Sequence, residues 1–298
     1  MIRGIIPPIP TPLTDDELLD LPSLRRLLEL NIAAGVHGLW VLGTTGRFDL
    51  VTDVEQRRVA EQVTEIVAGR VPLILNVSEM GTRRVLDKAA QFDDLPFDAY
   101  AVLSPWYRPM KRTELADFFR RLADELSRPL FIYNAPWVCN ALTFDHIREL
   151  AEHPRIVGVK DVTPSLVRPV SWPPVARESR GFSYLLGSYL ISTAASLGAD
   201  GFVTGLSGVF PELCVAAWDA ARRGDDVEAA RLDRILVKLA AAMESGSELA
   251  CLEVMFRYRG LGNRISAAPQ SQLDPGATKN LIATVKESGA LDNHLTRV

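Results

Sequence analysis

Cysteine is scarce in this chain of 298 residues, and its placement excludes two classes of protein. Cys139, Cys214 and Cys251 are odd in number and show no CxxC spacing, which speaks against both a disulfide framework and a zinc site. We expect all three thiols to pack as small apolar groups in or near the core.

Long apolar runs and an excess of basic charge are also missing. No stretch is long enough to span a membrane, and the opening "MIRGIIPPIPTP" is broken by prolines where a signal peptide needs an apolar region. The net charge of -4 gives no electrostatic case for nucleic acid or a membrane surface. We therefore expect a cytoplasmic protein that acts on small molecules.

Short β-branched runs are plentiful and alternate with amphipathic helical stretches. Gly35 is placed to end the first helix, and the capping-box sequence "TDVE" at 52–55 to begin the second. The predicted strands span residues 2–9, 38–42, 71–77, 99–104, 129–135, 156–161, 182–187 and 201–205.

Eight such units predict an α/β fold, a (β/α)8 TIM barrel. We assign residues 1–222 to the barrel and residues 223–298 to a C-terminal helical extension packed on it, because this region holds more helix than the eighth unit needs. The alternative is an open doubly wound sheet, but no G-x-G-x-x-G follows the first strand.

The most unusual residue at a predicted strand end is Lys160, in "RIVGVKDVT". Reactive groups of such a barrel lie at the C-terminal ends of its strands. Burial in an apolar strand favours the neutral amine, which attacks carbonyl groups and forms Schiff bases. The competing interpretation is a lysine that pairs with a carboxylate at the barrel mouth.

Two neighbouring strand ends add groups that suit the same chemistry. Tyr133 ends the preceding strand, and its phenol is a candidate proton carrier. The loop "GTTG" carries Thr44 and Thr45, whose hydroxyl and backbone N–H groups suit a carboxylate. Together they predict a 2-oxo acid substrate. Taken alone, such a tyrosine is more often a packing residue, and such a loop is more often a tight turn.

Histidine contributes nothing to this constellation. His37, His146, His153 and His294 are scattered, with none at the end of a predicted strand. A metal site needs converging histidine and carboxylate ligands, and a Ser-His-Asp triad needs a placed histidine. We therefore expect neither a metal nor a triad.

The ordered motifs "GTTG", "SPWYRP", "YNAP", "GVKDVT" and "GADGFVTGLSGVFPE" resemble the dihydrodipicolinate synthase / N-acetylneuraminate lyase family of class I aldolases. The resemblance covers nearly the whole chain. It implies a Schiff-base lyase that needs no metal or organic cofactor. It also implies a homotetramer built as a dimer of dimers.

The resemblance also assigns roles to individual residues. Lys160 matches the lysine that condenses with pyruvate or a related 2-oxo acid, and Tyr133 matches the proton-relay tyrosine. Thr44 and Thr45 match the carboxylate loop, with Thr45 also linking two tyrosines. The second is Tyr107, which matches a tyrosine that a neighbouring subunit lends to the site.

Other positions are implied to surround the substrate. Val203 matches a residue whose backbone carbonyl lies near the keto acid, and Gly187 a small residue beside the pocket. The family loop usually ends in Glu, where this chain has Arg47. Two interpretations of Arg47 are open. It is either a surface residue that pairs with Asp49 or Asp53, or a residue whose guanidinium binds an acidic substrate.

A second departure follows "YNAP". Val138 stands where the biosynthetic synthases carry an arginine, so it cannot anchor the carboxylate of aspartate semialdehyde. Trp137 and Val138 suggest a more apolar acceptor side of the pocket. Asn140 replaces a glycine and is expected to tolerate a left-handed backbone.

The sequence thus predicts a class I aldolase that forms or cleaves a C–C bond between a 2-oxo acid and an aldehyde. One alternative is a dehydratase or hydratase-aldolase that acts on a 2-keto-3-deoxy sugar acid or an aromatic pyruvate derivative. The non-enzymatic alternative is a regulatory protein that binds a 2-oxo acid.

Overall fold

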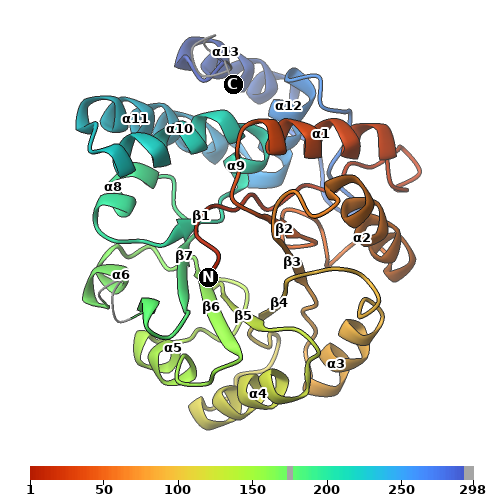
Figure 1. Ribbon diagram of the computed structural model, residues 1–298. Coiled ribbons are helices and arrows are strands. Elements are labelled where there is room, and N and C mark those ends of the chain that lie inside the picture. Colours follow the sequence, from red (N-terminus) through yellow and green to blue (C-terminus); the bar gives the residue numbers. More distant parts are fainter. Residues whose placement is uncertain (173–176, 292–298) are drawn as a thin grey trace.

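The computed structural model describes residues 1–172 and 177–291, and it contains all eight predicted strands. They are parallel and lie within the predicted ranges, although most are shorter (Figure 1). Their bounds are β1 (Gly4–Ile5), β2 (Leu39–Val41), β3 (Leu73–Asn76), β4 (Ala99–Leu103), β5 (Leu130–Asn134), β6 (Ile156–Asp161), β7 (Ser183–Leu186) and β8 (Gly201–Phe202).

The sheet closes into a barrel. Its strand order is β1-β8-β7-β6-β5-β4-β3-β2, so β1 pairs with the last strand, and a further bridge joins Pro8 to Trp40 of β2. The backbone N–H of Ile9 donates to the carbonyl of Trp40 at 2.9 Å. Prolines such as Pro8 lack an N–H, which explains why β1 is short. The (β/α)8 TIM barrel is confirmed, and the open doubly wound alternative is wrong.

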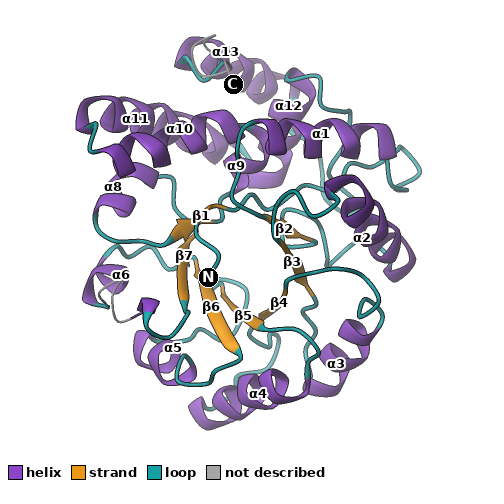
Figure 2. Ribbon diagram, viewed as in Figure 1, coloured by secondary structure: helices purple, strands orange, loops and turns teal. Residues whose placement is uncertain are grey.

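Helices surround the barrel on its outside, as Figure 2 shows. The predicted end of the first helix and start of the second are confirmed. Gly35 follows the first helix with φ of 79°, and the Thr52 side chain caps the second. The helices of the barrel are α1 (Leu21–Ala33), α2 (Asp53–Val67), α3 (Thr82–Ala90), α4 (Arg112–Glu125), α5 (Phe144–Leu150), α6 (Val167–Ser171), α8 (Ile191–Ser196), α9 (Gly205–Val209) and α10 (Pro211–Arg223).

Further helices follow α10: α11 (Asp226–Ala242), η1 (Met243–Ser245), α12 (Glu248–Tyr258) and α13 (Pro275–Ser288). They pack on one another and on α8, α9 and α10 at one side of the barrel (Figure 1). A domain boundary at residue 222 stays a prediction. The last part of the predicted extension, residues 292–298 with His294, lies outside the described residues, as do residues 173–176.

The core has two layers, because successive strand residues point alternately into the barrel and towards the helices. The inner layer includes Ile6, Trp40, Phe131 and Tyr133. The outer layer is larger and also holds two of the three cysteines, while Cys139 is half-buried beside the inner layer. Among the described residues no helix is long and apolar enough to cross a membrane.

Candidate active site

The alternation of side chains along β6 decides which of its two charged residues faces the barrel interior. Lys160 is 4% exposed and lies in register with Tyr133 of β5 and Leu185 of β7, both members of the inner layer. Asp161 therefore points outward. Two residues before Lys160, a Cβ on Gly158 would lie 2.2 Å from the Phe131 ring, so glycine there makes room for that ring.

Asp161 is fully engaged on the outer face. Its carboxylate accepts hydrogen bonds from Tyr184, Asn134 and Thr163, and pairs with Arg168 at 2.9 Å. Burial and the adjacent carboxylate raise the pKa of Tyr184, so this phenol stays a donor. The carboxylate next to Lys160 in sequence thus serves a network on the opposite side of the strand.

Lys160 has aromatic neighbours in place of a counter-ion. Its Nζ lies 4.2 Å from the centroid of the Tyr133 ring and 5.3 Å from that of the Trp40 ring. Within residues 1–172 and 177–291, no carboxylate lies at ion-pair distance from this amine. The interpretation of Lys160 as one half of a salt bridge is therefore wrong for this arrangement.

The amine borders a cavity of about 210 Å³ at the C-terminal ends of the strands. Its walls come from loops that follow β1, β2 and β5 to β8, together with the start of α12. The lining residues are Pro8, Thr44, Thr45, Tyr133, Trp137, Lys160, Val162, Gly187, Tyr189, Val203, Thr204, Gly205 and Glu248.

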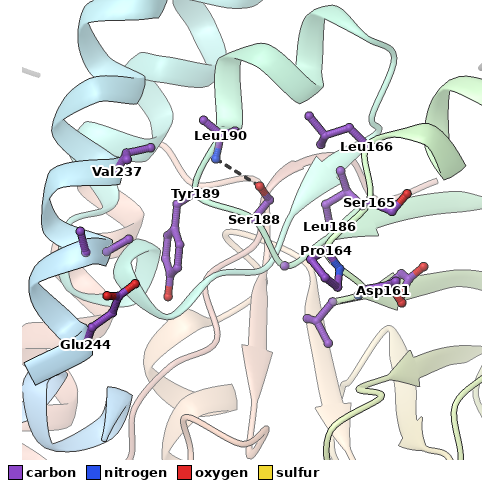
Figure 3. A pocket seen from close by; sticks show the side chains of 15 residues that line it. Asp161, Pro164, Ser165, Leu166, Leu186, Ser188, Tyr189, Leu190, Val237 and Glu244 are labelled. Atoms are coloured by element: carbon purple, nitrogen blue, oxygen red, sulfur yellow. Dashed lines mark hydrogen bonds between the residues drawn. The ribbon is translucent and has the colours of Figure 1, made fainter. Parts of the chain in front are cut away.

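A second cavity of about 540 Å³ adjoins it and shares Val162, Gly187 and Tyr189 with it. In Figure 3 the Tyr189 ring lies between the helical segment with Val237 and Glu244 and the loops around Asp161. The described residues that line this larger space include no lysine. We assign the chemistry to the smaller cavity, because the buried amine opens into it.

The "GTTG" loop supplies one wall of the site. The hydroxyl groups of Thr44 and Tyr133 are 3.1 Å apart, at hydrogen-bond distance. The resemblance placed this link on Thr45, whereas the structure makes it through Thr44. Both threonines line the cavity, and in the described part of the chain neither backbone N–H donates to a protein acceptor. These free donors suit a carboxylate.

The backbone bends sharply on either side of this loop. Leu42 and Arg47 have φ of 53° and 61°, a left-handed conformation that is uncommon for residues other than glycine. Such strain is found where surrounding structure enforces a particular geometry. Here it accompanies the loop whose two threonines line the cavity.

Val203 and Gly187 also lie where the resemblance implied, on the cavity wall. A Cβ on Gly187 would come within 2.1 Å of the Val162 side chain, so a larger residue is excluded unless that valine moves. Glycine at this position thus lets the loops after β6 and β7 approach each other beside the amine.

Arg47 departs from the expectation of a substrate contact. The residue is 6% exposed, and its guanidinium donates to Gln270 at 2.6 Å and lies 3.5 Å from Asp49. It does not line the cavity. Its left-handed backbone turns the side chain towards the segment that precedes α13, which favours the structural interpretation, with Asp49 as one partner.

Tyr107 and Val138 lie together outside the smaller cavity. Both line a shallow depression of about 280 Å³, and Tyr107 is 87% exposed with φ of 75°. Trp137 lines both spaces. Within one chain, therefore, Val138 does not form the acceptor wall, and Tyr107 does not reach Tyr133.

Asn140 holds the loop that carries Tyr107. Its amide donates to the carbonyls of Pro105 and Arg108 and accepts from the N–H of Met110. Its φ is not positive, so the expected left-handed backbone was wrong. The side chain matters here because it connects the loops that follow β4 and β5.

The sequence did not single out six of the residues that line the cavity: Pro8, Val162, Tyr189, Thr204, Gly205 and Glu248. Thr204 stood inside the quoted motif "GADGFVTGLSGVFPE", and its position at a strand end was the available signal. Nothing local marks Glu248, which reaches the cavity because α12 packs against α9, the short helix that follows β8. Its Oε1 accepts a hydrogen bond from Tyr189 at 2.9 Å.

The described histidines lie away from the cavity. His37 Nδ1 accepts from the backbone of Ile5, His146 caps α5, and His153 pairs with Asp124. Burial lowers the pKa of His37. In the part of the chain that the structure describes, no group of three or more His, Cys, Asp or Glu side chains is arranged to hold a metal ion.

Fold and site together define a (β/α)8-barrel protein with a small-molecule cavity at the C-terminal ends of its strands and a buried amine facing it. The chain belongs to the dihydrodipicolinate synthetase family, whose model matches residues 1–288. This is a family of lyases.

Individual relatives agree with this assignment. The chain is 29% identical over 293 residues to a DapA-like lyase of Halobacterium salinarum, covering 97% of this chain and 95% of the relative. It is 31% identical over 243 residues to a probable 2-dehydro-3-deoxy-D-pentonate aldolase of Escherichia coli, covering 80% of each.

Solved structures show the same fold. A prophage protein of the dihydrodipicolinic acid synthase family from Escherichia coli K12, in complex with pyruvate, matches with a TM-score of 0.91, 25% identity, and coverage of 97% of this chain and 99% of that one. The dihydrodipicolinate synthase of Bacteroides thetaiotaomicron matches with a TM-score of 0.88, 30% identity, and coverage of 96% and 98%.

Proposed function

We propose that this protein is a class I aldolase, in which Lys160 forms a Schiff base with a 2-oxo acid such as pyruvate. The observation that carries the proposal is the buried Lys160 amine, which faces a cavity and has no counter-ion among the described residues. The pyruvate complex of the prophage protein and the relative named as a pentonate aldolase support the same substrate class.

The covalent step begins with the neutral amine. Lys160 Nζ attacks the C2 keto carbon, and the resulting carbinolamine loses its hydroxyl as water to give a protonated imine. In the cleavage direction, a base removes the proton of the C4 hydroxyl, the C3–C4 bond breaks, and its electron pair passes into the enamine. An aldehyde leaves, C3 takes up a proton, and water releases the 2-oxo acid.

Tyr133 and the "GTTG" loop are assigned the supporting roles. The Tyr133 phenol, beside the amine and linked to Thr44, carries protons for the carbinolamine and for C4. The free backbone donors at Thr44 and Thr45 bind the carboxylate of the 2-oxo acid. Carboxylate binding would place the keto carbon beside Lys160.

We further propose that Tyr107 serves a neighbouring subunit of a homotetramer, built as a dimer of dimers. Its exposed ring sits on a strained loop that Asn140 anchors, an arrangement suited to presenting a side chain outward. Because no described residue that lines the cavity is positively charged apart from Lys160, we expect no turnover of aspartate semialdehyde.

Trapping with borohydride tests the proposal. The protein is incubated with pyruvate and sodium borohydride, digested, and mapped by mass spectrometry. We expect one reduced adduct, at Lys160, and none without pyruvate. Lys160→Ala should abolish the adduct, whereas Lys88→Ala, a change at the other buried lysine, should leave it intact.

Absence of an adduct at Lys160 would refute both the aldolase and the related dehydratase chemistry, and would favour a binding protein. If the adduct forms, incubation with 2-keto-3-deoxy sugar acids separates the two reactions. Release of an aldehyde identifies an aldolase, and loss of water with the carbon chain intact identifies a dehydratase.

A further inference from the structure

A carboxylate lies in the wall of the smaller cavity, beside residues that follow β7 and β8. Glu248, the first residue of α12, lines the cavity together with Tyr189 and Thr204. None of the steps assigned above uses these three side chains. Their chemistry therefore bears on the part of the substrate that lies beyond the reacting carbons.

The position of the carboxylate is built into the fold. Ser247 caps α12, which fixes where Glu248 begins, and the Tyr189 hydroxyl donates to Glu248 Oε1 at 2.9 Å. A Cβ on Gly205 would lie 2.5 Å from that same oxygen. Glycine at 205 thus allows the carboxylate to approach the loop after β8.

Tyr189 acts as a donor in this pair. Its burial raises the pKa of the phenol, and the charge of Glu248 raises it further. The phenol consequently stays protonated and orients the carboxylate. Glu248 itself makes no ion pair with any described residue, and its second oxygen accepts no hydrogen bond from them. The residue is exposed at the cavity mouth, where an incoming molecule can reach it.

Thr204 adds a second unsatisfied polar group. It is 4% exposed, lines the cavity, and its Oγ1 has no hydrogen-bond partner among the described residues. A buried hydroxyl without a partner carries a free-energy cost that a bound ligand relieves. A hydroxyl both donates and accepts, so it matches an alcohol group of a substrate.

We propose that Glu248, oriented by Tyr189, and Thr204 form a subsite that recognises hydroxyl groups on the aldehyde portion of the substrate. The subsite rests on the proposed aldolase function and narrows its substrate class to hydroxyaldehydes and the polyhydroxylated 2-oxo acids formed from them. A carboxylate accepts hydrogen bonds from alcohols and repels a second anion. Aldehydes that carry a carboxylate are therefore disfavoured.

The test compares three aldehydes with pyruvate as the common donor: glyceraldehyde, propionaldehyde without hydroxyls, and anionic succinic semialdehyde. We expect the protein to prefer glyceraldehyde. Glu248→Ala should lower kcat/KM for glyceraldehyde by about 10- to 100-fold, mainly through KM, because a hydrogen bond to a charged group is lost. The value for propionaldehyde should stay within about threefold, since that aldehyde makes no such bond.

Two further variants separate recognition from structure. Glu248→Gln keeps the shape and removes the charge, so it should raise the acceptance of succinic semialdehyde relative to glyceraldehyde. Glu244→Ala removes a nearby carboxylate that lines only the larger cavity, and it should leave the preference among aldehydes unchanged.

Borohydride trapping of pyruvate keeps the two proposals distinguishable. No adduct at Lys160 in the unmodified protein overturns the aldolase function itself. A normal adduct, combined with equal use of glyceraldehyde and propionaldehyde or an equal loss of both in Glu248→Ala, overturns only the subsite. A changed ratio of the two aldehydes with trapping intact supports it.

Discussion

Two lysines in this barrel are buried to nearly the same extent but differ in their surroundings: one pairs with a carboxylate, and the other lies beside aromatic rings. Lys160, 4% exposed, lies on the inner face of β6 beside two aromatic rings and a cavity. Lys88, 7% exposed, lies in the last turn of α3 among the outer helices, where its amine pairs with Asp53 at the start of α2.

The comparison shows that burial alone does not define the role of a lysine. The Lys88 amine is engaged by a carboxylate, so it joins two helices of the outer layer. The Lys160 amine has no carboxylate partner among the described residues and borders a cavity, where a small molecule can reach it. Only the inner lysine therefore has the surroundings that the proposed Schiff base requires.

The largest effects come from removing each amine in turn. Lys160→Met should reduce turnover by about 10⁴-fold or more, because a covalent step loses its nucleophile. Lys88→Met should keep full activity and lower the free energy of unfolding by about 1 kcal/mol or less, since one partner of that pair is exposed. Steady-state kinetics and urea denaturation of both variants measure these effects.

If Lys88→Met lost activity while its folding stayed intact, the division between a structural outer lysine and a reactive inner one would be wrong. Circular dichroism of both variants serves as the folding control. Lys160→Met is expected to fold normally, because the site is lined by Tyr133 and Trp40, which accommodate an apolar chain.

The second difference between the lysines is the phenol beside Lys160. Tyr133→Phe keeps the ring and removes the proton carrier, so kcat should fall by about 10²–10⁴-fold. Imine formation should slow in parallel, which single-turnover trapping with borohydride measures at several time points. Unchanged trapping kinetics would show that the proton for the carbinolamine step comes from another group.

The inner site could be located from sequence because its signals are local. A β-branched run ending in Lys160, a tyrosine that closes the preceding strand, and a glycine-bounded loop all sit at strand ends, and the barrel brings strand ends together. The same reasoning predicted all eight strands. Strand lengths were overestimated where a proline such as Pro8 lacks the backbone N–H that would hydrogen-bond to the neighbouring strand.

What escaped prediction depends on tertiary packing. Glu248 reaches the cavity through the docking of α12, which no local pattern encodes. The direction of Arg47 follows from its left-handed backbone, and Val138 faces outward because of the loop that carries it. Which side chains of β6 face the barrel interior also had to be read from the structure. Lys160 and Asp161 are adjacent, and only the pairing register shows that Lys160 faces inward.

Variants of Thr44 and Thr45 extend the comparison of the two lysines, because they test which hydroxyl supports the phenol near Lys160. Thr44→Val removes the hydrogen bond to Tyr133 and should lower kcat by about tenfold. Thr45→Val should affect kcat less. Stopped-flow measurement of enamine formation in both variants distinguishes them, and a larger loss in Thr45→Val would return the relay link to that residue.

A smaller effect is expected at Asn140, which anchors the loop carrying Tyr107. Asn140→Ala removes three hydrogen bonds to that loop and should reduce kcat by about 2- to 10-fold while leaving pyruvate trapping at Lys160 intact. Hydrogen exchange of residues 105–110 should accelerate. Unchanged exchange there would show that the loop is held by its backbone alone.

The smallest effect tests whether a missing counter-ion is enough to create a reactive amine. Asp53→Asn leaves Lys88 buried without its carboxylate and should cost about 1 kcal/mol of stability or less, because Asp53 is largely exposed. We expect no pyruvate adduct at Lys88 after borohydride reduction, since Lys88 lines neither of the two cavities at the strand ends. Peptide mapping should again find the adduct at Lys160 alone. An adduct at Lys88 would mean that desolvation by itself suffices, and that the loop after β2 contributes affinity without being required for the chemistry.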